Sequence, residues 1–378
     1  MKAPANPLPP AHLTPIQIKD FRRRLAHWYQ RNARQLPWRG VNDPYRTWVS
    51  EIMLQQTRVA AVIDHYERFI RLFPTLLALA LAPQEDVLAA WSGLGYYRRA
   101  RMLHRAAQFV VEELGGELPT NATGLRTLPG VGVYTSAAIA SICFGESVAV
   151  VDGNVERVLL RITGLPELAS TSSTTHTLLH RLANELVPAK RLSAKANAAG
   201  DHNQAMMELG ATLCTPRAPQ CIVCPVRALC RTRGEHPTPP RPRQRSSPQA
   251  YLLTTRKRGV VTDVLLARRP EDASLMPGML ELPPLPELAV AGREPILRLR
   301  HAITNTNYYV SIFAQEGTSD RALQQVVAAT GSESLVWRPL HRLAELPLTG
   351  LARKVLTRMK LHSVTGPETP VRQPASAP

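Results

Sequence analysis

The segment Thr120–Arg157 constrains the fold of this 378-residue chain more than any other stretch. Apolar residues at helical spacing run up to Gly130-Val131-Gly132, and a second helical pattern starts directly after it, which predicts a hairpin of two helices. The glycines permit a sharp turn and leave N–H groups bare at a helix N-terminus, where a DNA phosphate would be stabilised. An ordinary helix pair in an all-α core has the same pattern, so the turn alone defines no function.

Asp152 stands where a structural role and a catalytic role are both open. It follows an apolar run at 148–151 and precedes another helical pattern. Aspartate is a common N-cap in this position, because its carboxylate accepts a hydrogen bond from a free N–H of the first turn. The same carboxylate would also be available for catalysis beside the hairpin, and the two roles are compatible.

Residues 44–73 are predicted to form one long helix whose apolar stripe runs from Trp48 to Phe69. Glu51 lies on or beside this stripe. A glutamate at the edge of a stripe is commonly a surface residue. If the helix buries it instead, desolvation raises its pKa, and it can act as a general acid near neutral pH. The polar cluster 55–58 interrupts the stripe and is either a solvated turn or a wedge for a base stack.

Four of the five cysteines fall close together, with six, two and five residues between them. A cluster of so rare a residue in a large chain favours a metal site over disulfides. Four thiolates can hold zinc or an iron–sulfur cluster, and the spacing itself does not choose between them. The four are Cys214, Cys221, Cys224 and Cys230, whereas Cys143 is predicted to be a small core residue.

The charge balance indicates a polyanionic partner. The chain has 46 Lys and Arg against 29 Asp and Glu, a formal net charge of +17. Nucleic acid is the first expectation, with an anionic membrane surface as the alternative. No apolar run approaches the roughly 20 residues of a membrane span, and the N-terminus is proline-rich, so we expect a cytoplasmic protein.

A segment rich in Pro, Arg, Ser and Gln at 234–250 predicts a linker between two domains. Before it we expect helices at 16–30, 174–187 and 204–213, with two short ones within 76–114. Beyond it we expect a β-hairpin across 257–259, strands at 307–313 and 335–337, and helices at 320–330 and 349–361. The predicted divisions are a mobile N-terminus 1–13, a helical domain 14–233, the linker 234–250, an α+β domain 251–363 and a disordered tail 364–378.

Several motifs together resemble the endonuclease III superfamily of DNA glycosylases, and within it the MutY-type adenine DNA glycosylases. The similarity covers residues 20–230 almost continuously. It implies a mainly α helix–hairpin–helix region with a [4Fe-4S] cluster on the four cysteines. It further implies base excision repair of DNA, in which adenine mispaired with 8-oxoguanine or guanine is flipped out and removed. The motifs are Leu36-Pro37-Trp38-Arg39, Trp48–Thr57, Gly93–Tyr97, Leu128–Gly132, Asp152-Gly153-Asn154 and Asn203–Glu208.

The resemblance assigns roles to particular residues. Glu51 would protonate the adenine, and Asp152 would stay ionised to stabilise the sugar cation. Tyr134 and Asn154 would support them by hydrogen bonding. Because Tyr134 stands where the bifunctional lyases carry a lysine, we expect weak or no lyase activity. Trp38, Arg39 and Gln204 would line the adenine pocket, Gln56, Thr57, Leu94 and Tyr96 would form the wedge that reads the opposite strand, and Gly130, Val131 and Gly132 would grip a phosphate.

The second domain resembles the Nudix-like domain that MutY-type proteins use to recognise 8-oxoguanine. Met276–Pro283 is similar to a conserved stretch of that domain, although no magnesium-binding Nudix box follows it. The family's His-x-Phe-Ser-His loop is here His301-Ala302-Ile303-Thr304-Asn305. Thr304 and Asn305 would therefore face the oxidised base without the usual aromatic and second histidine. We expect a weaker preference for 8-oxoguanine over guanine.

Three other functions are consistent with parts of the sequence. A thymine or uracil mismatch glycosylase would share the hairpin and the cysteines, although Glu51 and the second domain argue against it. A non-catalytic DNA-binding or redox protein would have no need of both Glu51 and Asp152. A Nudix hydrolase with a DNA-binding arm would need the missing metal box. We expect a monomer whose linker is available to repair or replication proteins.

Overall fold

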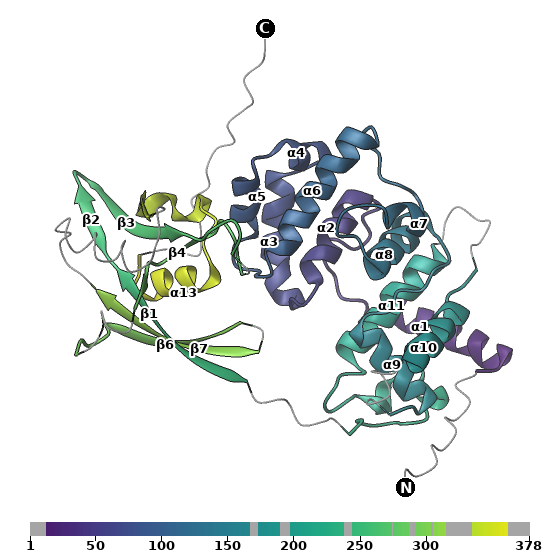
Figure 1. The fold of residues 1–378 in the computed structure, drawn as a ribbon. Helices are drawn as coiled ribbons and strands as arrows, with labels where there is room; N and C mark the ends of the chain where they lie inside the picture. Colours follow the sequence, from purple (N-terminus) through teal and green to yellow (C-terminus); the bar gives the residue numbers. More distant parts are fainter. Residues whose placement is uncertain are drawn as a thin grey trace. The chain divides into compact units, whose positions relative to one another are not determined.

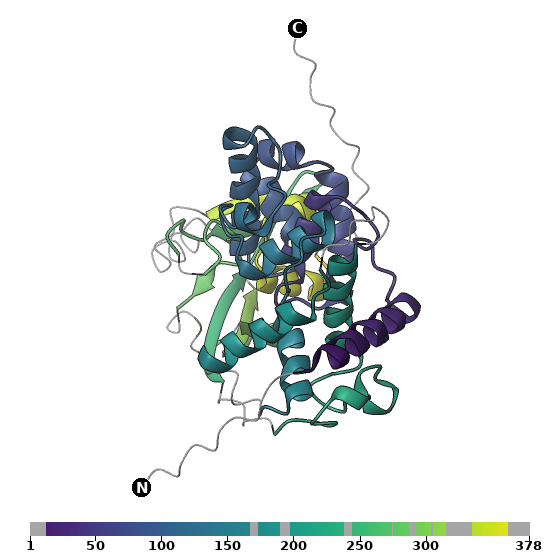
Figure 2. The same ribbon diagram turned by 90° about the vertical axis from the view of Figure 1, so that its right-hand side faces the viewer.

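A computed structural model describes residues 13–166, 173–189, 197–237, 244–273, 275–286, 290, 292–303, 305–314 and 335–361. The chain forms two compact units: Met1–Leu81 with Met102–Arg241, and Ala82–Arg101 with Pro242–Pro378. The predicted helix at 320–330 and the predicted disordered tail lie outside the described residues. Figures 1 and 2 show the secondary structure of both units from two directions.

The described part of the first unit is helical (Figure 1). One hydrophobic core joins its first helix to three helices from later in the chain, and a second group of helices packs around the predicted hairpin. The helices are α1 Pro15–Asn32, α2 Pro44–Leu54, α3 Val59–Leu72, α4 Leu76–Leu81, α7 Ala122–Leu125, α8 Val133–Phe144, α9 Gly153–Thr163, α10 Ser173–Leu186 and α11 Ala198–Thr212, while α6 Arg98–Glu113 begins in the second unit and continues into the first.

Helix α11 is central to the first unit, because it packs against α1, α8 and α9 (Figure 1). Helix α2 packs against α8 and α3. Residues Tyr45 and 47–53 of α2 are buried, as are residues 135–141 of α8. The side chains of these buried residues are therefore placed in a dry interior, and this sets the environment of the candidate active site.

The prediction of one helix over residues 44–73 is wrong. Helix α2 ends at Leu54, and α3 begins at Val59. Gln56 between them has φ 56°, a left-handed conformation that no helix can continue through. The polar cluster that interrupts the apolar stripe is thus a turn. Residues 76–114 likewise form three helices rather than the predicted two, since α4, α5 (Gln84–Trp91) and α6 all lie there.

The predicted helical hairpin is present as α7, a glycine turn and α8. Gly130 has φ 75°, and a Cβ there would lie 2.7 Å from the Cβ of Met102. Both the backbone conformation and the lack of space therefore require glycine at this position. Gly132 is the N-cap of α8. Gly130 and Gly132 are both exposed, which leaves the turn open to a ligand.

The second unit contains two small β-sheets and helix α13 (Gly350–Arg358), joined by one hydrophobic core (Figure 1). The first sheet has the order β5-β1-β7-β6, in which β1 and β7 are parallel over nine residues. In the second, β2, β4 and β8 pair antiparallel with β3. The strands are β1 Arg245–Leu253, β2 Thr255–Arg258, β3 Val261–Arg268, β4 Leu280–Glu281, β5 Pro284–Leu285, β6 Leu297–Ile303, β7 Thr306–Ala314 and β8 Leu335–Pro339.

Two predictions for this unit need correction. Strand β1 begins at Arg245, inside the stretch predicted as linker, because main-chain pairing with β7 does not require apolar side chains. The β-hairpin exists, but β3 pairs with Thr255–Arg258 and not with the stretch at Tyr251, which lies in the other sheet. The predicted strands at 307–313 and 335–337 correspond to β7 and β8, and the predicted helix at 349–361 corresponds to α13.

Candidate active site

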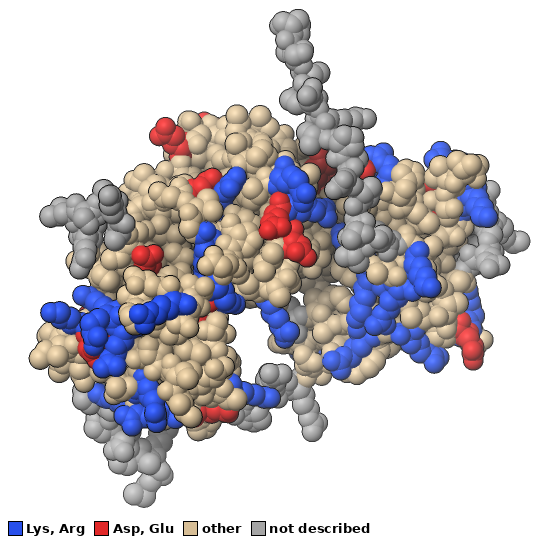
Figure 3. All heavy atoms as spheres, turned by 180° about the vertical axis from the view of Figure 1, so that it is seen from behind, with Lys and Arg blue, Asp and Glu red and all other residues tan. Residues whose placement is uncertain are grey.

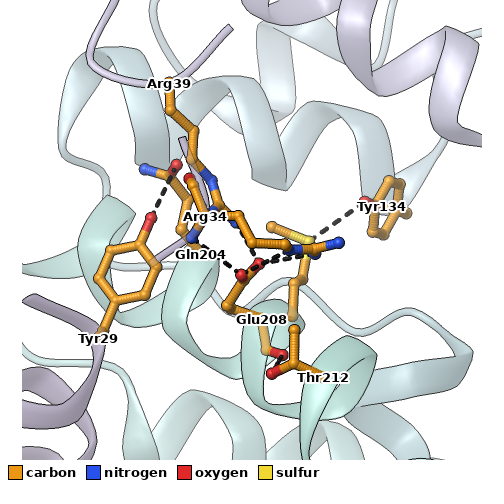
Figure 4. Close-up of polar contacts among 8 residues, drawn as sticks. Tyr29, Arg34, Arg39, Tyr134, Gln204, Glu208 and Thr212 are labelled. Carbon is orange, nitrogen blue, oxygen red and sulfur yellow. Dashed lines mark hydrogen bonds and ion pairs between the residues drawn. The ribbon is translucent and has the colours of Figure 1, made fainter. Parts of the chain in front are cut away.

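Glu51 and Tyr134 meet in the interior of the first unit. Glu51 on α2 is only 5% exposed, and its Oε2 accepts a hydrogen bond of 2.7 Å from the hydroxyl of Tyr134 on α8. The same hydroxyl lies 3.4 Å from the sulfur of Met207 on α11 (Figure 4). Three helices thus fix the position of one carboxyl group. The sequence left open whether Glu51 is buried. Its burial supports the interpretation of Glu51 as a general acid and not as a surface residue.

Burial raises the pKa of Glu51 from 4.5 to about 7. The hydrogen bond from Tyr134 and the charge of Arg39 lower this pKa, whereas the nearby charge of Asp152 raises it. The carboxyl group can therefore carry a proton near neutral pH and can also give that proton to a substrate in the same pH range. A group of this kind is suited to general acid catalysis.

Asp152 is the N-cap of α9, as the sequence predicted. Its Oδ1 accepts a hydrogen bond of 2.7 Å from the N–H of Val155, and its Oδ2 accepts one of 2.9 Å from the side-chain amide of Asn154. Arg157 in turn donates to the amide oxygen of Asn154 at 2.9 Å and to the main-chain oxygen of Cys214 at 2.8 Å. Hydrogen-bond donors therefore satisfy both oxygens of Asp152 and fix its carboxylate at the start of α9.

A group of charged and polar side chains lies on α11 and the segment after α1 (Figure 4). Glu208 is fully buried and accepts hydrogen bonds from Arg34 and Arg39, with N–O distances of 2.6 to 2.8 Å. Burial would raise the pKa of Glu208, but the two arginines outweigh it and lower the pKa to about 2. Tyr29 donates to the side-chain oxygen of Gln204 at 3.3 Å, and the Arg39 guanidinium lies 5.5 Å from the centroid of the Tyr29 ring.

This network places Arg39 and Gln204, two of the predicted pocket residues, beside each other. Glu208 fixes Arg39 and is a further functional candidate. It is part of the motif Asn203–Glu208, but no role was predicted for it from the sequence. Glu208 follows Gln204 by four residues, so both lie on one face of α11. This spacing is the sequence signal that could have identified Glu208 as part of the site. Trp38, the third predicted pocket residue, is buried and packs edge-on against Tyr66, with ring centroids 5.2 Å apart.

The predicted wedge residues fall in both units. Gln56 is exposed in the turn after α2, and the Thr57 hydroxyl donates to the main-chain oxygen of Gln55 at 3.3 Å. Leu94 and Tyr96 lie in the loop between α5 and α6, which belongs to the second unit. Tyr96 is 49% exposed, whereas Leu94 is buried.

All four clustered cysteines line one cavity. No group of three His, Cys, Asp or Glu side chains among the described residues is arranged to hold a single metal ion. Arg161 lies against the cavity, and its guanidinium donates to the sulfur of Cys214 at 3.3 Å. Four thiols around one shared cavity, with a cation beside them, are a donor set that can hold zinc or an iron–sulfur cluster.

The surface carries more positive than negative charge, as the composition requires. On the face drawn in Figure 3, Lys and Arg side chains gather in groups, whereas Asp and Glu are scattered. No helix in the described ranges is long and apolar enough to cross a membrane. Of the two predicted contacts to an oxidised base, Asn305 is exposed at the turn between β6 and β7, and Thr304 lies outside the described residues.

The glycine hairpin, the buried Glu51 and the capping Asp152 all lie within one stretch of the chain that matches a known protein family. Residues 49–185 match the family model described as HhH-GPD superfamily base excision DNA repair protein. The adenine DNA glycosylase of Mycobacterium tuberculosis is 40% identical over 262 residues, which cover 68% of this chain and 82% of that protein. The chain belongs to the adenine DNA glycosylase family.

Two further comparisons set the extent of the similarity. The adenine DNA glycosylase of Rattus norvegicus is 49% identical over 237 residues, but the match spans only 44% of its length and 60% of this chain. A solved structure of a thermostable thymine-DNA glycosylase aligns with a TM-score of 0.52 and 30% identity, covering 58% of this chain and 98% of that one. These likenesses bear out the predicted family and the helical fold of the first unit.

Proposed function

We propose that this protein is an adenine DNA glycosylase of base excision repair that removes adenine mispaired with 8-oxoguanine or guanine. The single observation that carries the proposal is the buried Glu51 carboxyl group, whose pKa of about 7 fits a general acid at neutral pH. It lies beside the Asp152 charge and is oriented by the Tyr134 hydroxyl. Membership of the adenine DNA glycosylase family supports adenine as the base that is released.

In this mechanism the two carboxyl groups act in opposite protonation states. Glu51 gives its proton to N7 of the flipped adenine, so the base leaves as a neutral molecule when the bond between N9 and C1′ breaks. The bonding electrons depart with the base, and C1′ becomes an oxocarbenium centre. Asp152 stays ionised and stabilises this cation until water adds to C1′ and loses a proton. Trp38, Arg39 and Gln204 line the proposed adenine pocket, with Glu208 fixing Arg39.

We further propose that the cysteine cavity holds a [4Fe-4S] cluster. Cys214, Cys221, Cys224 and Cys230 supply four thiolates, and Arg161 offsets part of the negative charge. The cluster would order the loop at the end of the helical unit. The positive surface groups and the exposed turn at Gly130–Gly132 support duplex DNA as the partner, with the turn binding a phosphate.

Residues 251–363 are proposed to form a Nudix-like domain that recognises 8-oxoguanine near Thr304 and Asn305. We propose that the protein works as a monomer in the cytoplasm, where the segment before β1 is available to repair or replication proteins. It is proposed to be monofunctional, because Tyr134 provides no amine for a Schiff base. Borohydride should therefore trap no covalent complex with DNA, and an efficient trapped complex would contradict this point.

A second candidate is removal of thymine from mismatches. The likeness to a thymine-DNA glycosylase at 30% identity is the observation that favours it. The two candidates differ in the base that must be protonated and released, so a panel of substrates separates them. Thymine opposite guanine is the substrate for the second candidate, and adenine opposite 8-oxoguanine or guanine is the substrate for the first.

The test is single-turnover base release from duplexes that carry A:8-oxoG, A:G, T:G and thymine glycol. The variant Glu51→Gln keeps an oxygen that accepts a hydrogen bond from Tyr134, but its amide group has no acidic proton to give to the base. Glu146→Gln is the matched control, since Glu146 accepts from the N–H of Ala122 at 2.7 Å and is a structural glutamate of the same unit. We expect adenine release that only Glu51→Gln abolishes. Release from T:G alone would favour the second candidate, and tight binding without release would overturn both.

A further inference from the structure

The loop Gly93–Tyr97 carries two of the proposed wedge residues, and the second unit fixes its position. Residues 82–101 precede the helical hairpin in sequence but pack with residues 242–378. Helix α5 packs against the short helix Leu340–Glu345, and Glu85 of α5 forms a 2.9 Å ion pair with Arg268 of β3. The loop that follows α5 is therefore part of the same compact body as the proposed 8-oxoguanine domain.

Two buried hydroxyl groups bind the base of this loop to one main-chain oxygen. Ser92 is fully buried, and its Oγ donates to the carbonyl oxygen of Leu348 at 2.8 Å. Tyr97 is 3% exposed, and its hydroxyl donates to the same oxygen at 3.0 Å. The two donors lie at either end of the loop, so both ends are hydrogen-bonded to the same carbonyl oxygen.

The acceptor itself is held firmly. Leu348 is fully buried, forms a parallel bridge with Leu280 of β4, and immediately precedes the N-cap of α13. The N–H of the next residue, Thr349, donates to the carbonyl oxygen of Leu280 at 2.8 Å. The carbonyl of Leu348 thus belongs to the rigid part of the domain, where a strand and a helix meet.

The loop between the two hydroxyl groups has a conformation that few residues adopt without support. Gly93, Gly95 and Tyr96 have φ values of 111°, 70° and 49°. A tyrosine in the left-handed region persists only where its surroundings over-determine it. The indole N–H of Trp91, the last residue of α5, donates to the Gly95 oxygen at 3.2 Å and supports this conformation from the helix before the loop.

We infer that Ser92 and Tyr97 are positioning residues that set the discrimination between 8-oxoguanine and guanine, by holding the Leu94–Tyr96 loop in a fixed position on the domain that contains α13. This inference rests on the proposed function, in which Leu94 and Tyr96 read the strand opposite the adenine. Neither residue is proposed to touch DNA. Their removal should therefore change selectivity for the opposite base and leave the chemistry at Glu51 intact.

The test compares the full-length wild type with Ser92→Ala, Tyr97→Phe and the double variant. Tyr45→Phe is the matched control, because its buried hydroxyl donates to the main-chain oxygen of Phe73 at 2.7 Å, away from the loop. Each protein is assayed for single-turnover adenine release from A:8-oxoG and A:G, for melting temperature, and for hydrogen exchange at residues 93–97.

Each single variant should lower the ratio of the A:8-oxoG rate to the A:G rate by about fivefold, the effect of one lost buried hydrogen bond. The double variant should lower it about tenfold, while the A:G rate stays within about twofold of wild type. Exchange at residues 93–97 should become faster in these variants and not in Tyr45→Phe, even where melting temperatures fall equally.

An unchanged ratio in the double variant would overturn the inference, as would an equal change in Tyr45→Phe. Faster exchange with an unchanged ratio would overturn the specificity role as well. A wild type that releases no adenine would overturn the proposed function and this role together, whereas adenine release with an unchanged ratio would overturn the inference alone.

Discussion

The hydroxyl of Tyr134 donates a 2.7 Å hydrogen bond to the carboxyl group of Glu51 across 83 positions of sequence. Burial raises the pKa of this carboxyl group, and the Tyr134 hydrogen bond opposes that rise. Together with the charges of Asp152 and Arg39, these effects leave the pKa at about 7. The pair therefore orients the proton donor and also sets the pH range in which it works.

Tyr134→Phe should shift the pH dependence of adenine release. Without the hydrogen bond that stabilises the carboxylate, the pKa of Glu51 rises, and the alkaline limb of the rate profile moves up by about one pH unit. The plateau rate should fall about tenfold because the acid is less well oriented. Single-turnover kinetics between pH 6 and 10 measure both effects. A limb that moves to lower pH would contradict this account of the pair.

The variant Asp152→Asn separates the role of Asp152 as the N-cap of α9 from the role of its negative charge in catalysis. Asparagine caps helices as well as aspartate does, so the melting temperature should change by no more than about 3 °C. Loss of the negative charge should slow adenine release by at least about 100-fold. It should also lower the pKa of Glu51, since the Asp152 charge raises it.

Asp43→Asn is the control for this variant, because Asp43 caps α2 in the same way, with a hydrogen bond of 3.1 Å from the N–H of Arg46. It should leave the release rate unchanged. If Asp152→Asn kept more than a tenth of wild-type activity, the role of Asp152 as the charge that stabilises the cation would be wrong.

Glu208 should make stability depend on pH in the acid range. Its pKa in the folded protein is about 2, below its ordinary value of 4.5. A depressed pKa contributes free energy of unfolding that is fully present above pH 4.5 and is lost as the pH falls toward 2. Glu208→Gln should therefore cost about 2 kcal/mol at pH 7, with a smaller difference from wild type near pH 3.

Urea unfolding at pH 7, 5 and 3 checks this prediction. Asp20→Asn is a useful comparison, because Asp20 forms its ion pairs with Arg23 and Arg24 on the surface of α1, and such pairs contribute little. A Glu208→Gln variant as stable as wild type at pH 7 would show that the buried ion pairs only balance their desolvation.

The ratio of the A:8-oxoG rate to the A:G rate should be lower than in a family member with the complete His-x-Phe-Ser-His loop. The reason is chemical: Ile303 and Asn305 replace an aromatic and an imidazole that would contact the oxidised base. Ile303→Phe combined with Asn305→His should raise the ratio about tenfold, the value of one or two added contacts. An undiminished ratio in the wild type would refute this expectation.

Local features of the fold were predictable from the sequence. The hairpin at Gly130–Gly132 and the cap at Asp152 follow from residue types whose backbone preferences are strong. The cysteine spacing likewise indicated one shared site before any fold was known. The break at Gln56 was not predicted, because the apolar stripe resumes at Val59 directly after the polar cluster 55–58.

Features that depend on distant partners were not predictable in the same way. The burial of Glu51 depends on α8 packing against α2, and no pattern within α2 specifies that. The role of Glu208 depends on Arg34 and Arg39, which lie 174 and 169 positions away in the sequence. The same holds for Ser92 and Tyr97, whose shared acceptor at Leu348 lies more than 250 positions away.

The pH dependence of single-turnover adenine release from A:8-oxoG duplex tests the central claim most directly. If Glu51 is the proton donor, the rate should be constant in mildly acidic solution and should fall tenfold per pH unit above a midpoint near 7. In Glu51→Gln any residual release should lack this dependence. A wild-type rate that stays constant from pH 6 to 9 would contradict the account, because no buried acid would then be losing its proton.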